Sequence, residues 1–459
     1  MSLIKSISGI RGTIGGAPGN TLSPLDIVKF TSAYATWLKA RTTNKKVVVG
    51  RDGRMSGLMV QGIVVNTLMS MGFDVVDCGL STTPTIEMAV VFENAAGGII
   101  LTASHNPKEW NALKLLNEKG EFISAADGAA LLSIAEKEAF DYASVDELGK
   151  LIINNDSLAK HIKAVVSHPL VNVTKIKNKN FKIIVDAINS SGAFALPELF
   201  KVLGVTDFTI LNAEMHGNFA HNPEPLAQHL TDLCSEVVKQ KADVGIAVDP
   251  DVDRLCFVSD DGILFGEEYT LVSIADYFLQ HRKGNTVSNM SSTRALRDVT
   301  VQHGGEYFSS VVGEVNVVNK MKEVNAVIGG EGNGGIIVPD LHYGRDALIG
   351  VALFLTYVAE KNISVSELKK TYPEYFMSKN KIDLVEGIQV ASIFKTIQYK
   401  YRSEQINIED GLKIDFADGW VHLRTSNTEP IIRVYSESKS EEKAIKLAQQ
   451  IMEDIKILF

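Results

Sequence analysis

Residues 45–79, KKVVVGRDGRMSGLMVQGIVVNTLMSMGFDVVDCG, decide the fold class of this chain. The apolar, β-branched residues at 47–49 predict a strand that ends in polar loop residues at 51–54. Residues 57–72 predict a helix closed by Gly72, and residues 73–79 predict the next strand. Because strand, polar loop, helix and strand follow in this order, the stretch predicts an α/β unit with parallel strands.

The same order returns twice along the chain. FKIIVDAINSSG at 181–192 precedes a helical pattern at 193–204, and NTVSNMSSTRAL at 285–296 repeats the strand and polar loop. The last 85 or so residues differ, because a hairpin pattern at 411–426, with its turn at Asp418-Gly419, precedes a helical pattern at 440–458. We therefore expect three similar α/β units and a smaller α+β C-terminal piece. Polar zones between them place the boundaries, giving the ranges 1–152, 153–256, 257–370 and 371–459.

Composition narrows the classes of function. The chain has 459 residues, too many for one core, and its net charge of −9 argues against general nucleic-acid or anionic-membrane binding. An anionic ligand therefore needs a local basic pocket. Cys78, Cys234 and Cys256 have no CxxC spacing, so we expect neither a disulfide framework nor a zinc site. The start MSLIKSISGIRG lacks a signal-peptide core and no run reaches transmembrane length, so a soluble cytoplasmic protein is expected.

TASHNPKEWNALKL, residues 102–115, follows the apolar run 95–102. A strand that ends in Ser104, flanked by His105 and Asn106, is suited to presenting a hydroxyl oxygen. The alternative is that Ser104 begins a turn or caps a helix, as Ser, Asn and Pro commonly do.

VGIAVDPDVDRL, residues 244–255, places Asp249, Asp251 and Asp253 at alternate positions after an apolar strand. In an extended backbone this spacing puts the three carboxylates on one face, where hard oxygen ligands suit Mg²⁺. The adjoining Arg254 can hold a phosphoryl group. A solvated acidic turn is the plain alternative. An EF-hand is excluded, because Arg254 and Asp260 stand where Gly and Glu are required; a phosphoaspartate DxD loop stays open as a minor rival.

Three further loops are candidate ligand contacts. RTSNTEPIIRVYSE at 424–437 combines hydroxyls, an amide and arginines as a phosphate cradle would, although a hairpin turn uses the same residues. GGEGNGG at 329–335 lacks a Walker pattern, and its Glu331 can accept hydrogen bonds from sugar hydroxyls. SGIRGTIGG at 8–16 places Arg11 between glycines, either toward a ligand or in a turn.

Taken in order, the TASHNP, DPDVDR, GEGNGG and RTSNTEP loops resemble those of the α-D-phosphohexomutases, and the resemblance covers essentially the whole chain. It implies four domains around a central cleft, three α/β units with mixed sheets and a smaller α+β fourth domain. It also implies an isomerase, an intramolecular phosphotransferase that interconverts hexose 6-phosphate and hexose 1-phosphate. The implied partners are small-molecule sugar phosphates, bound by a cytoplasmic monomer or homodimer.

The resemblance assigns roles residue by residue. Ser104 is implied to be carried as phosphoserine, with Mg²⁺ held by one of its oxygens and by Asp249, Asp251 and Asp253. The phosphoryl group passes to a sugar monophosphate and returns from a hexose 1,6-bisphosphate, which also serves as activator. The remaining implied residues are His105, Lys114 and Arg254 for catalysis, and Arg11, Glu331, Asn333, Arg424, Ser426, Asn427, Thr428 and Arg433 for the substrate.

Two departures from the family pattern stand out. Gly335 occupies the position where many members have a histidine, so His342 in HYGRDA is a hypothetical substitute. VGEVNVV at 312–318 also lacks the Lys or Arg that often follows its Gly-acid pair. The short TASHNP form slightly favours glucosamine phosphate as substrate, with a dual phosphomannomutase/phosphoglucomutase as the alternative. A non-catalytic sugar-phosphate binder and a phosphatase are more distant alternatives.

Overall fold

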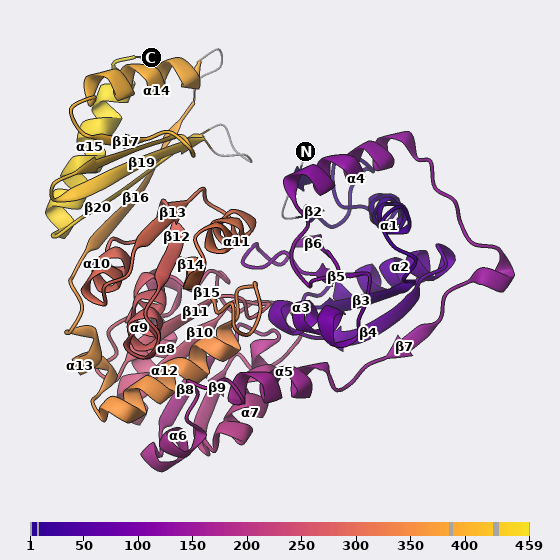
Figure 1. Ribbon diagram of the computed structural model, residues 1–459, viewed down its shortest axis with the longest axis horizontal. Coiled ribbons are helices and arrows are strands. Elements are labelled where there is room, and N and C mark those ends of the chain that lie inside the picture. The colour runs from indigo at the N-terminus through magenta and orange to yellow at the C-terminus, as the bar shows by residue number, and fades with distance from the viewer. Residues whose placement is uncertain (1, 7–8, 385–388, 426–430, 459) are drawn as a thin grey trace. The chain divides into compact units, whose positions relative to one another are not determined.

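The chain forms two compact units in the computed structural model, which describes residues 2–6, 9–384, 389–425 and 431–458 (Figure 1). Unit 1 comprises Met1–His281 and Asn333–Lys369, and unit 2 comprises Arg282–Gly332 and Lys370–Phe459. Residues 257–370, predicted as one domain, are thus divided between the units. The four predicted boundaries stay a prediction.

The first sheet of unit 1 is mixed, with seven strands in the order β1-β2-β6-β5-β3-β4-β7. The strands are β1 (Ile4–Ser6), β2 (Gly9–Thr13), β3 (Lys46–Arg51), β4 (Asp74–Leu80), β5 (Gly97–Leu101), β6 (Trp110–Leu116) and β7 (Leu151–Ile153). β5, β3, β4 and β7 run parallel, and β6, β2 and β1 pair antiparallel. The strand predicted at 73–79 is β4, and the strand predicted within 45–54 is β3.

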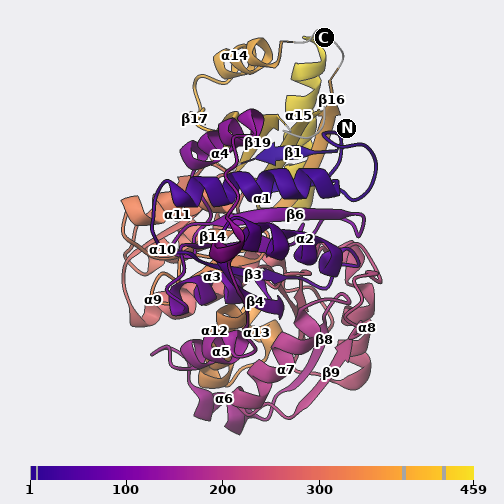
Figure 2. The same cartoon turned by 90° about the vertical axis from the view of Figure 1, so that its right-hand side faces the viewer.

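Helices cover both faces of this sheet because side chains along each strand alternate between faces. They are α1 (Pro24–Lys39), α2 (Gly57–Ser70), α3 (Thr83–Phe92) and α4 (Ala125–Lys137). Val47 and Val49 join the core under α1, α2 and α4, whereas Val48 joins the core under α3. Figure 2 shows α1 and α4 side by side over the sheet. The helix predicted at 57–72 is confirmed as α2, and Gly72 follows it with φ of 81°.

The second sheet of unit 1 has the order β11-β10-β8-β9. Its strands are β8 (Lys182–Asp186), β9 (Asp207–Leu211), β10 (Val244–Val248) and β11 (Leu255–Ser259), and only β11 is antiparallel to its neighbour. Unit 1 also contains β15 (Gly335–Ile337), α5 (Ser157–Val166), α6 (Val173–Lys179), α7 (Gly192–Leu203), α8 (Thr231–Gln240), α9 (Glu267–His281), α12 (Ala347–Lys361) and α13 (Val365–Lys369). Residues 347–359 of α12 are all buried, as expected for a helix that is apolar around most of its circumference.

Unit 2 begins with parallel strands in the order β13-β12-β14. These elements are β12 (Asn285–Asn289), β13 (Tyr307–Ser310), β14 (Ala326–Glu331), α10 (Ala295–Gln302) and α11 (Glu314–Glu323). The strand and helix predicted within 285–296 are confirmed as β12 and the start of α10. Unit 2 therefore repeats the strand-loop-helix order of unit 1.

The C-terminal part of unit 2 is an antiparallel sheet, β16-β20-β19-β18-β17, with two helices. Its elements are β16 (Phe376–Asp383), β17 (Gln405–Asn407), β18 (Leu412–Phe416), β19 (Gly419–Thr425), β20 (Ile431–Ser438), α14 (Val390–Lys400) and α15 (Glu441–Lys456). The α+β prediction is confirmed. The hairpin turn is one residue earlier than predicted, because Gly419 already pairs with Phe416 and the turn residues are Ala417 and Asp418.

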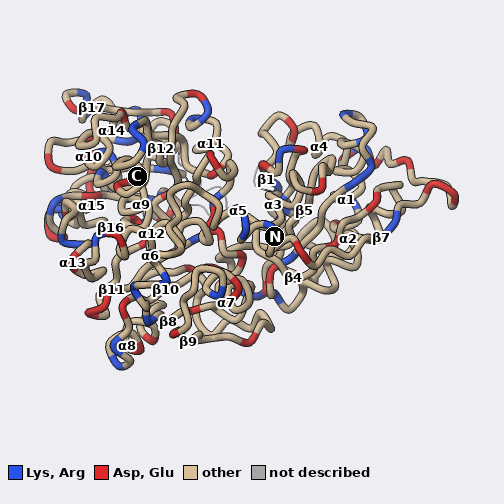
Figure 3. Tube along the Cα trace, turned by 60° about the horizontal axis from the view of Figure 1, so that its bottom comes forward, with Lys and Arg blue, Asp and Glu red and all other residues tan. Residues whose placement is uncertain are grey.

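The polar zone that places the first predicted boundary, near residue 152, contains a further strand. Leu151–Ile153 form the edge strand β7, because the backbone of β4 offers a free parallel neighbour there. Basic and acidic positions are interleaved over both units (Figure 3). Within the described residues, no helix combines the length and apolarity needed to cross a membrane.

Candidate active site

Ser104 lies three residues beyond the end of β5, in a strained backbone conformation. Its φ of 49° is in the left-handed region, which few non-glycine residues adopt. The backbone N–H of Ser104 donates to the Thr102 hydroxyl at 2.9 Å. The Ser104 hydroxyl is buried and donates to Asp249 Oδ2 at 2.7 Å. The turn thus directs the serine hydroxyl toward the acidic loop, and a helix cap is excluded because no helix follows.

A buried arginine holds the serine loop in this shape. Arg54 forms an ion pair with Asp52 at 3.0 Å, and its guanidinium donates to the backbone carbonyls of Ser104, Asn106 and two further loop residues, Pro107 and Trp110. Asp52 also accepts a hydrogen bond from Thr102 at 2.7 Å. Sequence reasoning missed Arg54, because a basic residue in a polar loop carries no spacing signal.

The three predicted aspartates converge, although not on an extended backbone. Asp249, Asp251 and Asp253 lie in the connection between β10 and β11, where Val252 has a φ of 63°. Each offers one oxygen, and these oxygens lie within 4.8 Å of one another. Asp249 Oδ1 accepts the backbone N–H groups of Asp253 and Arg254, both at 3.1 Å. A tight turn, rather than the alternation of a strand, therefore gathers the carboxylates.

The three aspartates are buried, and the pKa values of Asp249 and Asp251 are shifted in opposite directions. Burial, together with the Asp251 and Asp253 carboxylates, raises the pKa of Asp249 well above its ordinary value. Burial works in the same direction on Asp251, but the Lys114 ammonium and hydrogen bonds from Asp249 and Thr83 outweigh it and lower the pKa of that carboxyl. Lys114 Nζ lies 2.8 Å from Asp251 and 3.4 Å from Asp253. Burial alone would lower the pKa of Lys114, and these two carboxylates raise it.

Lys114 is therefore a buried ammonium on β6. Two oxygens of the triad still need a positive partner. Among the described residues, neither Oδ1 of Asp251 nor Oδ1 of Asp253 has a hydrogen-bond partner, although both atoms are buried. Since leaving buried carboxylate oxygens unpaired is costly, this donor set fits a hard divalent cation such as Mg²⁺.

Arginines and a neutral histidine surround the triad. Burial, and next the charges of Arg254, Arg11 and Arg345, lower the pKa of His105 well below its ordinary value. His105 Nδ1 lies 3.5 Å from the Ser104 hydroxyl. Burial, then Arg254, lower the pKa of Arg11 on β2. The local field is therefore positive beyond the carboxylates, as an anionic ligand requires.

Arg345 is the second residue that sequence reasoning missed. It is buried, and its guanidinium lies 2.6 Å from Asp253 Oδ2. Gly335 leaves space for the Arg345 side chain, because a Cβ at position 335 would lie 2.3 Å from Arg345 Cδ. The glycine in the position of the family histidine thus leaves room for an arginine. The signal that could have found Arg345 is its place in HYGRDA, a short distance after the glycine that stands where many family members have a histidine.

The two sugar-loop residues fall in different units. Asn333 belongs to unit 1, where Oδ1 accepts the backbone N–H of Gly335 at 3.2 Å. Glu331 ends β14 in unit 2, and its buried Oε1 accepts from Asn289 at 3.0 Å and from the backbone of Gly313 at 3.1 Å.

The predicted phosphate cradle lies partly outside the described residues, because Ser426, Asn427 and Thr428 are among those left out. The flanking arginines are described. Arg424 on β19 pairs with Arg433 on β20, and Arg433 in turn pairs with Lys381 on β16. Directly opposed like charges destabilise a sheet unless an anion compensates them. Carboxylates of the chain already face two members of this row of three cations, because Arg424 Nε lies 2.8 Å from Asp410 and Lys381 Nζ lies 3.6 Å from Asp383, so the row by itself does not indicate an anion site.

Comparison with known proteins identifies the family. Residues 3–142, 159–262 and 266–375 match the phosphoglucomutase/phosphomannomutase alpha/beta/alpha domains I, II and III, and residues 360–454 match the C-terminal domain of the same family. The chain belongs to the phosphoglucomutase/phosphomannomutase family. It is a phosphohexomutase, an isomerase that moves a phosphoryl group within a hexose phosphate.

Similar family members span the whole chain. A phosphoglucomutase/phosphomannomutase of Thermococcus kodakarensis is 35% identical over 452 residues, which cover 96% of this chain and 98% of that protein. A phosphoglucosamine/phosphogalactosamine mutase of Sulfurisphaera tokodaii is 31% identical and covers 98% of both chains. The structure of a phosphoglucomutase/phosphomannomutase family protein from Burkholderia thailandensis matches with a TM-score of 0.84 and 25% identity, over 99% of this chain and 98% of that one.

His342, the hypothetical substitute for the family histidine in this phosphohexomutase, is held between two carboxylates. Its Nδ1 lies 3.4 Å from Glu87 and its Nε2 lies 3.3 Å from Asp346. Both ring nitrogens therefore face carboxylates of unit 1. The expectation that His342 replaces the histidine stays a prediction, testable by the turnover of His342→Ala.

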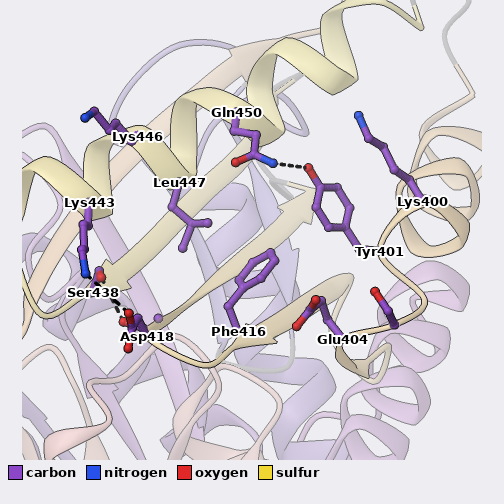
Figure 4. Close-up of a pocket in the computed structure, with 12 residues that line it drawn as sticks. Lys400, Tyr401, Glu404, Phe416, Asp418, Ser438, Lys443, Lys446, Leu447 and Gln450 are labelled. Carbon is purple, nitrogen blue, oxygen red and sulfur yellow. Dashed lines mark hydrogen bonds and ion pairs between the residues drawn. The ribbon is translucent and has the colours of Figure 1, made fainter.

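A separate pocket of about 580 Å³ lies in the C-terminal part of unit 2, lined by α15 and the end of α14 (Figure 4). Its lysines already pair with carboxylates: Lys443 with Asp418 at 3.4 Å and Lys400 with Asp454 at 2.6 Å. None of the predicted site residues lines this pocket.

Proposed function

We propose that this phosphohexomutase interconverts hexose 6-phosphate and hexose 1-phosphate through a phosphoserine at Ser104 and a hexose 1,6-bisphosphate intermediate. The observation that carries the proposal is the Ser104 hydroxyl, buried 2.7 Å from Asp249 at the edge of the aspartate triad. A hydroxyl held there can carry a phosphoryl group whose charge the surrounding cations neutralise, which is the main requirement for phosphoryl transfer.

Mg²⁺ is the cofactor we propose, held by Asp249, Asp251 and Asp253 with an oxygen of phosphoserine. When bound, it would neutralise charge on the transferring group. The chain's own residues do the rest. Arg254 orients the transferring phosphoryl group and Arg11 contacts the incoming sugar phosphate.

The two titratable groups beside the triad suit different tasks. The Lys114 ammonium, held charged by Asp251 and Asp253, supplies electrostatic stabilisation. The imidazole of His105 stays neutral because burial and three nearby arginines depress its pKa, which makes it a weak base, so we assign it to orienting the serine loop through its 3.5 Å contact with the Ser104 hydroxyl. Asn333 and Glu331 are proposed to bind sugar hydroxyls. Arg424, Ser426, Asn427, Thr428 and Arg433 are proposed to hold the phosphate that does not react.

Glucosamine phosphate is the substrate we favour slightly, supported by the TASHNP form and by the 31% identical phosphoglucosamine/phosphogalactosamine mutase. The second candidate is a dual phosphoglucomutase/phosphomannomutase, since the 35% identical relative bears that name. kcat/KM should be measured on one preparation for glucosamine 6-phosphate, glucose 1-phosphate and mannose 1-phosphate, with Mg²⁺ and a trace of hexose 1,6-bisphosphate. A preference for the amino sugar supports the first candidate, and comparable rates on the other two support the second.

Trapping the phosphorylated residue tests the mechanism itself. We expect an acid-stable phosphate on Ser104 after incubation with hexose 1,6-bisphosphate, and we expect Ser104→Ala to lose turnover by orders of magnitude while the fold is kept. A labile acyl phosphate on Asp249 would support the phosphoaspartate alternative instead. Turnover of no hexose phosphate by folded wild-type protein would support the non-catalytic binder.

A further inference from the structure

A second group of metal-ligating side chains lies in unit 1, outside the aspartate triad. His161 on α5, His342 in the loop before α12, and Asp346 at the N-cap of α12 each offer one atom, and these atoms lie within 4.8 Å of one another. The Nε2 atoms of both histidines converge on one oxygen, Asp346 Oδ2, at 2.8 and 3.3 Å. In a tetrahedral zinc site with bonds of about 2.0–2.1 Å, neighbouring ligand atoms stand about 3.3 Å apart. Two of the three separations are therefore close to those that one ion requires, and the third is no more than 4.8 Å.

The outer contacts of these residues are those of metal ligands. His161 Nδ1 lies 2.9 Å from the Thr85 hydroxyl, and His342 Nδ1 lies 3.4 Å from Glu87 Oε2. Metal-binding histidines usually have the second ring nitrogen held by a hydroxyl, carbonyl or carboxylate, which fixes the ring. Asp346 is fixed as well, because its other oxygen accepts the backbone N–H of Leu348 at 2.8 Å as a helix cap. All three candidate ligands are thus preoriented.

The site is also enclosed. His161 and Asp346 have no exposed surface, whereas the His342 side chain keeps 12% of its surface exposed and leaves a path for an ion. Gly344 admits the Glu87 carboxylate, since a Cβ there would lie 1.8 Å from Glu87 Oε2. Two buried carboxylates face two imidazoles here, so the cluster needs positive charge that either protons or a divalent cation can supply.

We propose that His161, His342 and Asp346 form a second, structural metal site that binds a transition-metal ion of the Zn²⁺ type. Two imidazoles and one carboxylate suit such an ion, whereas the all-oxygen triad suits Mg²⁺. The two sites of unit 1 therefore differ in the metal that they select. This site does not depend on the proposed catalytic cycle.

A metal there would join three regions of unit 1. Thr85 and Glu87 lie in the segment that matches domain I, His161 in the segment that matches domain II, and His342 and Asp346 in the segment that matches domain III. Arg345 directly precedes Asp346 in the chain and forms an ion pair with Asp253. An ion bound to Asp346 would therefore also restrain the backbone that positions Arg345 at the aspartate triad.

Protons compete with the ion for this cluster. Burial lowers the pKa of His342, but hydrogen bonds and charge interactions with Asp346 and Glu87 outweigh it and raise the pKa to about 10. The imidazole rings of His161 and His342 also meet edge to face, with their centres 6.2 Å apart. The same carboxylates that hold a proton on His342 would hold a divalent cation in its place.

The test measures bound metal in the full chain rather than turnover. Protein stripped with a chelator is reloaded with Zn²⁺ in the presence of excess Mg²⁺, freed of loose metal by gel filtration, and analysed for zinc by mass spectrometry. We expect one zinc per chain in the wild type and its loss in His161→Gln and His342→Gln. His221→Gln is the matched control, because His221 Nε2 lies 2.9 Å from Asp186 in an isolated His–Asp pair, and this variant should keep its zinc.

Asp251→Asn distinguishes the two sites, because zinc retained by this variant cannot depend on an intact triad, whereas zinc lost with it would overturn the proposal. Co²⁺ loading of the wild type gives a test that needs no variant. We expect absorption bands of cobalt bound to nitrogen and oxygen ligands, and their absence from folded wild-type protein would overturn the proposal. Equal zinc content in wild type and His342→Gln would also overturn it. None of these results bears on phosphoserine formation at Ser104.

Discussion

At the scale of single residues, Gly335 and Arg345 show how a site is rearranged without losing its charge. The position at which many phosphohexomutases have a histidine is a glycine here, and the space is used by an arginine that reaches Asp253 at 2.6 Å. An arginine is permanently charged and offers several donors in a fixed plane. Where many family members have a histidine, which can gain or lose a proton, this chain thus has a permanently charged arginine beside the triad.

Gly335→Ala tests this arrangement. The added methyl would lie 2.3 Å from Arg345 Cδ and must push the side chain away from Asp253. Arg345 orients a carboxylate of the proposed metal site, and losing such a partner costs about 10–100-fold in activity, so we expect kcat to fall by that order while the fold is kept. Steady-state kinetics and circular dichroism on the same samples measure the two effects.

Gly62→Ala provides the matched control, because Gly62 is an exposed glycine within α2 and its added Cβ meets nothing within 4 Å. This variant should keep full activity and gain roughly 0.5–1 kcal/mol of stability from the better helix propensity of alanine. A Gly335→Ala enzyme with wild-type kcat would contradict the role given to Arg345.

The residues that sequence reasoning found and missed differ in one physical respect. Ser104 and the three aspartates could be predicted because their chemistry and spacing are local to one loop. Arg54 and Arg345 could not, because each acts on residues that lie far away in sequence: Arg54 on carbonyls about 50 positions later, Arg345 on a carboxylate 92 positions earlier. Even for the triad the stated reason was wrong, since a turn with Val252 at positive φ gathers the carboxylates.

At the scale of elements, the serine loop depends on one buried ion pair. The Arg54–Asp52 pair has no exposed side-chain surface, and Arg54 also satisfies four loop carbonyls. Arg54→Met leaves Asp52 as an uncompensated buried charge. We expect unit 1 to lose about 3–5 kcal/mol of stability, measured by urea unfolding, and we expect phosphorylation of Ser104 to fail under conditions where the variant stays folded.

Arg297→Met is the control for an exposed ion pair of the same type. Arg297 lies 3.1 Å from Asp298, and both side chains are substantially exposed. Solvent screens such a pair, so its loss should cost less than about 1 kcal/mol. Similar losses in the two variants would show that burial does not set the value of the Arg54 pair.

The raised pKa of His342, in the loop before α12, predicts how the stability of the protein depends on pH. In metal-free protein the pKa of His342 is raised to about 10 in the folded state, above the value of about 6.5 expected when it is unfolded. Its contribution to stability is therefore complete below about pH 6.5 and is lost as the pH rises toward 10. Between pH 7 and 9, with chelator present, the unfolding free energy of the wild type should fall by up to about 1.4 kcal/mol per pH unit more than that of His342→Gln. Parallel pH profiles of the two proteins would contradict the stabilised charge on His342.

Helices and strands with a strong sequence pattern of their own were predicted well. Strands that form only by pairing with another strand were not. The strand and helix of residues 45–72 follow from periodicity, and both were found. β7 was missed because Leu151–Ile153 become a strand only by pairing with β4. The helix α15 was found because Ser440 caps it and its apolar positions keep a helical period.

At the scale of the whole molecule, the chain crosses between its two compact units three times, at residues 281–282, 332–333 and 369–370. The proposed serine, metal and arginine groups that carry out the transfer lie in unit 1. Glu331 and the cation row of Arg424, Arg433 and Lys381 lie in unit 2. Chemistry and part of substrate recognition are thus assigned to units that have separate cores.

Calorimetry with and without Mg²⁺ tests whether the two units unfold separately and whether the aspartate triad of unit 1 binds the ion. Because each unit has its own core, we expect two unfolding transitions, of which Mg²⁺ stabilises only the one that belongs to unit 1. An ion bound only to the folded state stabilises it by about 2.7 kcal/mol at 100 times its dissociation constant. Asp251→Asn, which removes a buried carboxylate from the triad, should abolish the Mg²⁺ shift and leave the unit 2 transition where it was. A Mg²⁺ shift that survives in Asp251→Asn would place the ion elsewhere, and a shift of both transitions together would mean that the two units unfold as one.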